Sequence, residues 1–172
     1  PGAHELLARE QEVHPREPLA AGPPRPAADL LAETIASAPG EIVVVALGPL
    51  TNLAEAFEAD PSLAQQVKRI VIMGGAVDAP GNVANEEEGI DNAFAEWNIF
   101  ADPVAADIVL ASGAPITLVP LDATNDVPFT PFFAQTLDEH RTTPEAEAVA
   151  AMNAEKEAIV TGSGYTFWDT LA

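Results

Sequence analysis

Short apolar runs along the chain alternate with segments whose apolar residues recur every three or four positions. Three runs, Ile42–Leu47, Arg69–Met73 and Pro115–Val119, are rich in β-branched residues. Runs that are apolar on both faces are typical of buried strands in a parallel sheet. The sequence therefore predicts three strands, of which the first two are expected to be buried.

Helical patterns separate these strands. The first predicted helix covers Ala27–Ser37, and the second runs from Asn52 through Phe57 with Asn52 and Glu55 as a capping box. A short third helix has Pro61 in its first position, and Asp102 and Pro103 open a fourth at Val104–Ser112. The last predicted helix begins at Thr143 and Pro144 and ends near Val160. Strands that alternate with helices predict an α/β fold with a mostly parallel sheet flanked by helices and a Rossmann-like core.

Residues 1–26 differ from the rest because five prolines lie between positions 15 and 26. Such a density of proline interrupts regular structure, apart from a short helical possibility at Glu5–Gln11. We expect residues 1–26 to be irregular and 27–172 to form the α/β core, so that 1–172 is a single partial domain. A chain that opens on Pro1 rather than Met suggests a piece of a longer product.

The chain carries 27 acidic and 7 basic residues, a formal net charge of −20. This charge disfavours binding to nucleic acid or to an anionic membrane, whereas 48% hydrophobic residues indicate a folded protein. The only lysines are Lys68 and Lys156, which fits either adaptation to high salt or a GC-rich genome. With no cysteine, a metal would need oxygen or histidine ligands. No signal-peptide pattern is visible, and we expect a cytoplasmic protein.

Polar residues follow each predicted strand, in the segments Gly48–Asn52, Gly74–Asn98 and Leu121–Asp126. Ligands of open α/β sheets bind beyond the carboxyl ends of the strands. A tight turn with an N-cap explains Gly48–Asn52 equally well by itself. Glu96 and Asn98 are more informative, because an extended segment would point both side chains to one side. A carboxylate and an amide together suit the vicinal diol of a ribose.

Taken in order, the motifs resemble the nucleoside hydrolase family, the inosine/uridine-preferring N-ribohydrolases. The matching stretches are Val45–Ala54, Arg69–Gly75, Ala95–Pro103 and Val119–Thr124, with a weaker match at Phe167–Asp169. The resemblance implies hydrolysis of the N-glycosidic bond of ribonucleosides to free base and ribose by a Ca²⁺-bound water. It also implies a small-molecule ribonucleoside as partner, and a homo-oligomer, either a dimer or a tetramer.

The resemblance also implies roles for individual residues. The backbone carbonyl of Leu47 and the carboxylate of Asp169 match calcium ligands. The residues that match the substrate pocket are Met73, Glu96, Asn98 and either Asn82 or Asn92. Trp168 stands where better-known members have the histidine proposed to protonate the leaving base; an indole can stack on a base but cannot replace that acid.

One family feature is missing from the chain, the Asp-x-Asp-x-x-x-Asp-Asp signature that supplies further calcium ligands and the general base. Glu86–Glu88 is a solvated acidic run and no substitute, and His4, His14 and His140 are predicted surface residues. We therefore identify no catalytic residue in the chain and expect the general base upstream of Pro1. The 172 residues alone should have little activity and weak calcium affinity.

Two other interpretations remain open. The protein could be a non-catalytic ribose- or calcium-binding relative that has lost the general base. It could also be an unrelated α/β interaction domain, which the ordered motifs make a poor fit. The coding sequence before Pro1 distinguishes the enzyme from the non-catalytic relative.

Overall fold

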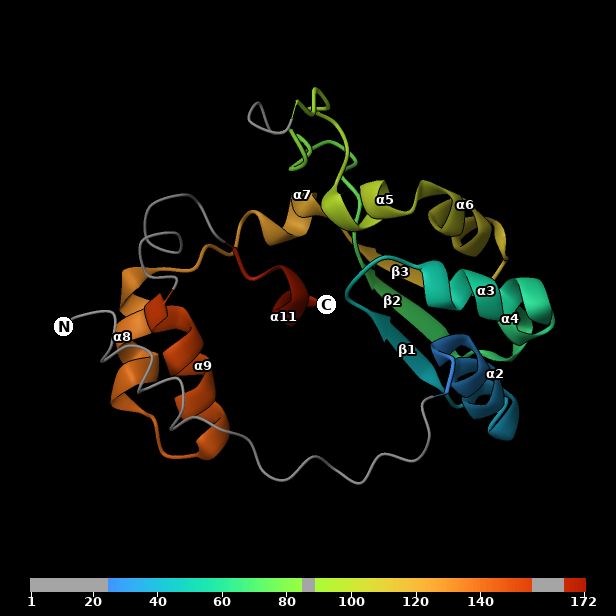
Figure 1. Ribbon diagram of the computed structural model, residues 1–172, viewed down its shortest axis with the longest axis horizontal. Coiled ribbons are helices and arrows are strands. Elements are labelled where there is room, and N and C mark those ends of the chain that lie inside the picture. Colours follow the sequence, from blue (N-terminus) through green and yellow to red (C-terminus); the bar gives the residue numbers. More distant parts are fainter. Residues whose placement is uncertain (1–24, 85–88, 156–165) are drawn as a thin grey trace. The chain divides into compact units, whose positions relative to one another are not determined.

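The computed structural model describes residues 25–84, 89–155 and 166–172 (Figure 1). These residues belong to two compact units, of which one comprises Arg25–Val127 with Thr166–Ala172 and the other includes residues 128–155. The single partial domain predicted over 1–172 stays a prediction. The irregular segment predicted at 1–26, apart from its last two residues, and the acidic run Glu86–Glu88 lie outside the described residues, as do His4 and His14.

The larger unit contains a sheet of three parallel strands in the order β1-β2-β3. The strands are β1 (Val43–Ala46), β2 (Arg69–Met73) and β3 (Ile116–Val119). Val45 pairs with Val71, which pairs in turn with Thr117. The predicted parallel sheet of an α/β fold is confirmed, with β2 at the predicted bounds.

Four helices cover one face of this sheet: α2 (Ala27–Ser37), α3 (Thr51–Ala59), α4 (Leu63–Gln66) and α6 (Pro103–Ala111) (Figure 1). Their apolar sides pack against β2, whose Ile70 and Ile72 are completely buried. Alternate residues of a strand point to opposite faces, so Val44 of β1 and Ile116 of β3 join the same core.

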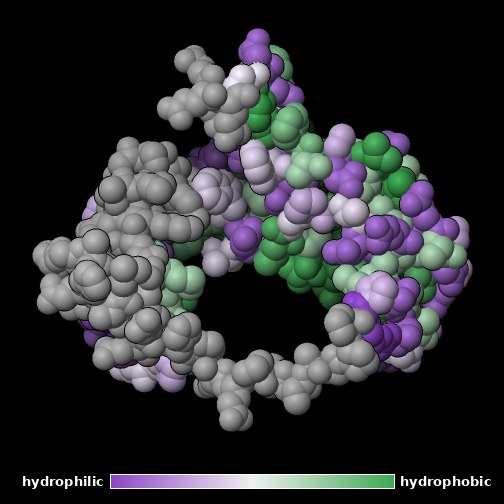
Figure 2. All heavy atoms as spheres, in the orientation of Figure 1, coloured by the Kyte–Doolittle hydropathy of each residue, from purple (hydrophilic) through white to green (hydrophobic). Residues whose placement is uncertain are grey.

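The other face of β1 is open in the part of the chain that the structure describes. Val43, Val45 and Leu47 are 46%, 53% and 43% exposed. Figure 2 shows apolar side chains gathered over β1 and β2. The prediction that β1 is buried on both faces is therefore wrong, because the helices cover only the face that carries Val44 and Ala46.

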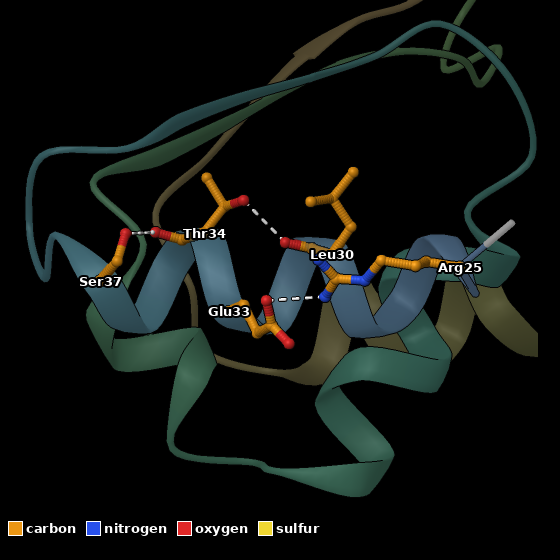
Figure 3. A network of polar contacts seen from close by, with 5 residues as sticks. All are labelled: Arg25, Leu30, Glu33, Thr34 and Ser37. Carbon is orange, nitrogen blue, oxygen red and sulfur yellow. Dashed lines mark hydrogen bonds and ion pairs between the residues drawn. The ribbon is translucent and has the colours of Figure 1, made fainter. Parts of the chain in front are cut away.

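Helix α2 has the predicted bounds, and Figure 3 shows polar contacts on its exposed side. Arg25 pairs with Glu33 at 2.6 Å, and the Thr34 hydroxyl donates to the carbonyl of Leu30 at 2.7 Å. Exposed ion pairs add little stability. The completely buried Ile35 anchors the helix instead.

Two predicted helix starts are wrong. Asn52 and Glu55 form no capping box, because α3 already begins at Thr51 and its N-cap, Leu50, makes no side-chain cap hydrogen bond. Pro61 lies in a turn before α4, in which the Asp60 carboxylate accepts from the backbone N–H and hydroxyl of Ser62. These local bonds delay the helix by two residues.

Helix α6 begins as predicted, with Asp102 as N-cap and Pro103 in its first position. The pattern did not predict α5 (Trp97–Ala101), α7 (Leu121–Thr124), α8 (Pro131–Glu139) or α11 (Trp168–Leu171). In the smaller unit, α9 (Pro144–Glu155) begins where expected, and its predicted end near Val160 lies outside the described residues. His140 is a surface residue at the end of α8, as predicted.

None of the helices in residues 25–84, 89–155 and 166–172 has the length and apolar character needed to cross a membrane.

Candidate functional site

A pocket of about 290 Å³ lies at the carboxyl ends of β1 and β2 in the larger unit. Leu47 directly follows β1 and Met73 is the last residue of β2. Seven of the eight predicted site residues line the pocket together with Trp97: Leu47, Met73, Asn82, Glu96, Asn98, Trp168 and Asp169. Asn92 is not among the lining residues.

Glu96 is the buried carboxylate of this pocket, with 3% of its surface exposed. Its Oε2 accepts from the backbone N–H groups of Gly75 at 2.9 Å and Ile99 at 3.1 Å, and its Oε1 accepts from that of Asn98 at 2.9 Å. Glu96 is thus the N-cap of α5 and also fixes the chain where it leaves β2. A Cβ on Gly74 would lie 3.3 Å from this Oε2, so the carboxylate sits close against the backbone.

The prediction that Glu96 and Asn98 share an extended segment is wrong. Glu96 itself is extended, but α5 starts at Trp97 and Asn98 lies in its first turn. The pocket still receives both side chains, because the N–H groups of Asn98 and Ile99 donate to the Glu96 carboxylate and so start a helix directly after Glu96.

Asn98 connects the ends of the two strands. Its Nδ2 donates to the carbonyl of Met73 at 3.0 Å and to that of Leu47 at 3.5 Å. The Leu47 carbonyl, the predicted metal ligand, is therefore turned toward the pocket side of the strand end.

The two candidate asparagines of the long loop have different surroundings. The Oδ1 of Asn82 accepts from the backbone N–H of Trp97 at 2.9 Å, which connects the loop to α5. The Oδ1 of Asn92 accepts from the N–H groups of Phe94 and Ala95 at 3.0 Å, a local turn away from the pocket lining. Geometry thus favours Asn82, and its contact with a substrate stays a prediction.

Trp168 and Asp169 reach the pocket from the chain's last helix. A hydrogen bond of 2.9 Å from the N–H of Phe167 to the carbonyl of Val127 holds the start of α11. Asp169 is exposed and Trp168 is half-buried.

Sequence reasoning missed two carboxylates that shape the site without lining it. Asp102 accepts from the Thr51 hydroxyl and the N–H of Ala105, and the pKa of Asp102 is lowered, first by the bond from Thr51. Asp122 accepts from three backbone N–H groups at residues 77–79, and these bonds lower its pKa. Asp102 was recognisable only as a helix cap; for Asp122 no local pattern indicates partners more than 40 residues away.

The pocket contains oxygen donors of the kind that calcium binds, but few of them. Leu47 offers a carbonyl and Asp169 a carboxylate, whereas Ca²⁺ takes about six to eight oxygens. Within residues 25–84, 89–155 and 166–172, no three His, Asp or Glu side chains gather in a group that could hold a metal ion. These two residues fit calcium in chemistry, as a partial ligand set.

Comparison with known proteins adds a family to this geometry. The sequence profile described as "Inosine-uridine preferring nucleoside hydrolase" matches residues 2–172. Uridine nucleosidase 1 of Arabidopsis thaliana is 48% identical to the chain over 101 residues, which are 59% of this chain and 28% of that protein.

Two solved structures resemble the chain. The inosine-uridine preferring nucleoside hydrolase of Bacillus anthracis superposes with a TM-score of 0.72 at 32% identity, over 86% of this chain and 46% of that one. The purine-preferring ribonucleoside hydrolase of Gardnerella vaginalis superposes with a TM-score of 0.71 at 29% identity, over 91% of this chain and 48% of that one. The chain thus spans about half the length of these solved relatives.

Proposed function

The chain belongs to the inosine-uridine preferring nucleoside hydrolase family, and on this basis we propose that the whole protein hydrolyses the N-glycosidic bond of ribonucleosides to free base and ribose. One observation carries the proposal. A buried carboxylate, Glu96, and two amides, Asn82 and Asn98, line a single pocket at the strand ends. Carboxylates and amides together bind vicinal hydroxyls, because the first only accept hydrogen bonds and the second also donate them.

Glu96 and Asn98 are positioned to bind the ribose. Oε1 of Glu96 takes one backbone N–H and keeps capacity to accept from a sugar hydroxyl. Asn98 uses its Nδ2 on the strand ends, so its Oδ1 is the acceptor that it offers to substrate. Both side chains are fixed before substrate arrives, and a ribose so held can be pulled toward the flattened ring of an oxocarbenium-like transition state.

The Leu47 carbonyl and the Asp169 carboxylate would hold a calcium ion together with oxygens from outside the described residues. When bound, the ion supplies a water of lowered pKa and orients the ribose hydroxyls. The general base for that water belongs to the family's Asp-rich signature, which we expect before Pro1.

Trp168 gives the pocket an aromatic surface for the base. Its indole ring can stack on a purine or a pyrimidine, and it has no proton to give a ring nitrogen at neutral pH. Protonation of the leaving base therefore falls to another group. We further propose that the protein is cytoplasmic and that, as the family resemblance implies, it assembles into a dimer or a tetramer.

The sparse calcium ligands favour a second candidate, a non-catalytic relative that binds ribose or calcium. A single assay distinguishes the two. The longest natural chain containing this sequence is tested for release of free base from uridine and inosine, with and without a calcium chelator. We expect chelator-sensitive release; ribose binding without any release would establish the non-catalytic relative instead.

The 172-residue chain serves as a second sample in this assay. Because it offers two of the oxygens that calcium needs, we expect weak calcium binding by calorimetry and little or no turnover. Turnover by this chain at the rate of the longer protein would contradict the incomplete ligand set.

A further inference from the structure

We propose that Asp122 is a positioning residue of the ribose pocket, which acts through the loop after β2 to place Asn82. The inference rests on the proposed function, because it assigns Asn82 to ribose binding. Asp122 does not line the pocket itself.

The carboxylate of Asp122 accepts hydrogen bonds from three successive backbone N–H groups. Oδ2 accepts from Val77 at 2.9 Å, and Oδ1 accepts from Asp78 at 2.7 Å and from Ala79 at 3.0 Å. Bonds from N–H groups to an ionised carboxylate are short and strong. The neighbouring residue of α7 adds a backbone bond, in which the N–H of Leu121 donates to the carbonyl of Gly75 at 2.9 Å.

These bonds hold a segment that connects two pocket residues. It begins after Met73, the end of β2, and runs without helix or strand to Asn82. At its far end the N–H of Asn82 donates to the carbonyl of Ala95 at 2.9 Å, and Oδ1 of Asn82 accepts from Trp97. Val77 and Asp78, in the middle of the segment, are exposed, and Asp122 is the side chain that fixes their path.

The three bonds that Asp122 accepts from Val77, Asp78 and Ala79 do not serve its own helix. Asp122 lies in the first turn of α7, but its acceptors are used by a segment 43 to 45 positions earlier in the chain. A helix cap would instead accept from N–H groups two or three residues later. This long-range use makes Asp122 a fixed point that determines where the loop, and with it Asn82, meets α5.

The test uses Asp122→Asn in the longest natural chain containing this sequence. The amide keeps one accepting oxygen but turns its NH₂ toward an N–H that the carboxylate had accepted from. We expect kcat/KM for uridine to fall about 10- to 100-fold, the scale for a displacement of about one ångström. The matched control Asp126→Asn removes the same charge from an exposed position four residues along and should leave kinetics unchanged.

A double-mutant cycle with Asn82→Ala tests the route. If Asp122 acts through Asn82, then Asp122→Asn adds less than twofold to the loss caused by Asn82→Ala alone. If the two losses multiply, Asp122 does not act through Asn82 and the inference is wrong. The melting temperature of each variant separates displacement of the loop from general unfolding.

Two further readouts do not need turnover. Hydrogen exchange of residues 75–82 should be faster in Asp122→Asn than in the wild type, and unchanged exchange would overturn the inference. The dissociation constant for ribose, measured by calorimetry, should rise in Asp122→Asn and not in Asp126→Asn. Ribose binding without nucleoside hydrolysis in the wild type would refute the proposed function while leaving these two tests in force.

Discussion

The hydroxyl of Thr51 donates a 2.6 Å hydrogen bond to Oδ2 of Asp102, although 51 positions separate the two residues. Thr51 is the first residue of α3 and Asp102 is the N-cap of α6, whose Oδ1 also accepts from Ala105. Leu47 lies in the turn between β1 and α3, and Asn98 lies in α5, the helix that precedes α6. The bond therefore joins the two helix starts that flank the pocket.

Replacing Thr51 by Val should lower the melting temperature by about 2–4 °C, the shift for loss of one such bond in a chain of this size. Valine keeps the shape of threonine and removes only the donor to Asp102. Thr34→Val is the matched control, because the Thr34 hydroxyl donates within its own helix on an exposed surface. Equal melting temperatures for wild type and Thr51→Val, by calorimetry, would show that the bond does not stabilise the fold.

Low pH should remove the contribution that the charge of Asp102 makes to the stability of the fold. Its pKa in the folded chain lies below the ordinary value of 3.8, because the ionised form accepts from Thr51 and Ala105. A lowered pKa adds stability that is complete above the unfolded value and is lost as pH falls through the folded one. The stability difference between wild type and Asp102→Asn should therefore be constant above about pH 5 and vanish below the folded pKa. Denaturant unfolding at several pH values measures it; a difference that persists unchanged into strong acid would refute the assignment.

Glu96→Gln should weaken both the fold and the pocket. The NH₂ of the glutamine amide would face a backbone N–H group, that of Asn98 or of Gly75, which donates to the carboxylate of Glu96 in the wild type. We expect a loss of about 1–3 kcal/mol in the free energy of unfolding, and a similar loss of transition-state binding, or roughly 10- to 100-fold in kcat/KM. Glu58→Gln, on the exposed side of α3, is the control. Wild-type kinetics for Glu96→Gln with uridine would exclude Glu96 from ribose binding.

The sequence predicted those elements whose cause is local. The bounds of α2 and β2 follow from apolar spacing, and α6 follows from Asp102 and Pro103. The capping box at Asn52 failed for a reason that lies elsewhere in the chain. α3 begins one residue earlier, where the Thr51 hydroxyl is engaged by Asp102, a partner that no window around residue 52 contains.

In the site, too, local sequence predicted which residues take part, whereas the contacts that hold them depend on distant parts of the chain. The ordered motifs contain six of the residues that the structure brings to one pocket, and the loop between two of the motifs offered Asn82, the seventh, as an alternative to Asn92. The motifs did not reveal how these residues are held, because Glu96 bonds to Gly75 and Asn82 to Trp97 across loops whose path depends on packing. In a chain with 27 acidic residues, nothing in the sequence around Asp122 distinguishes it from an acidic residue on the surface.

Gly81 is the position at which a single methyl group should disturb the pocket most directly. A Cβ there would overlap the backbone N and O of Ala95 and lie 2.5 Å from the backbone carbon of Phe94. Backbone atoms cannot turn aside as a flexible side chain can, so Gly81→Ala should separate the two segments. The bonds from the N–H of Gly81 to Ala93 and from that of Asn82 to Ala95 would be lost with it.

We expect Gly81→Ala to cost about 1–3 kcal/mol in unfolding free energy, as overpacking does, and to raise KM for uridine by moving Asn82. Gly48→Ala is the matched control for stability, since a Cβ there meets nothing within 4 Å. Denaturant unfolding and steady-state kinetics measure the two effects. If Gly81→Ala matched Gly48→Ala in both, the close approach of the two backbones would be unimportant for the pocket. A rise in KM without a change in unfolding free energy would instead show that the fold tolerates the separation and that the effect on binding comes from the position of Asn82.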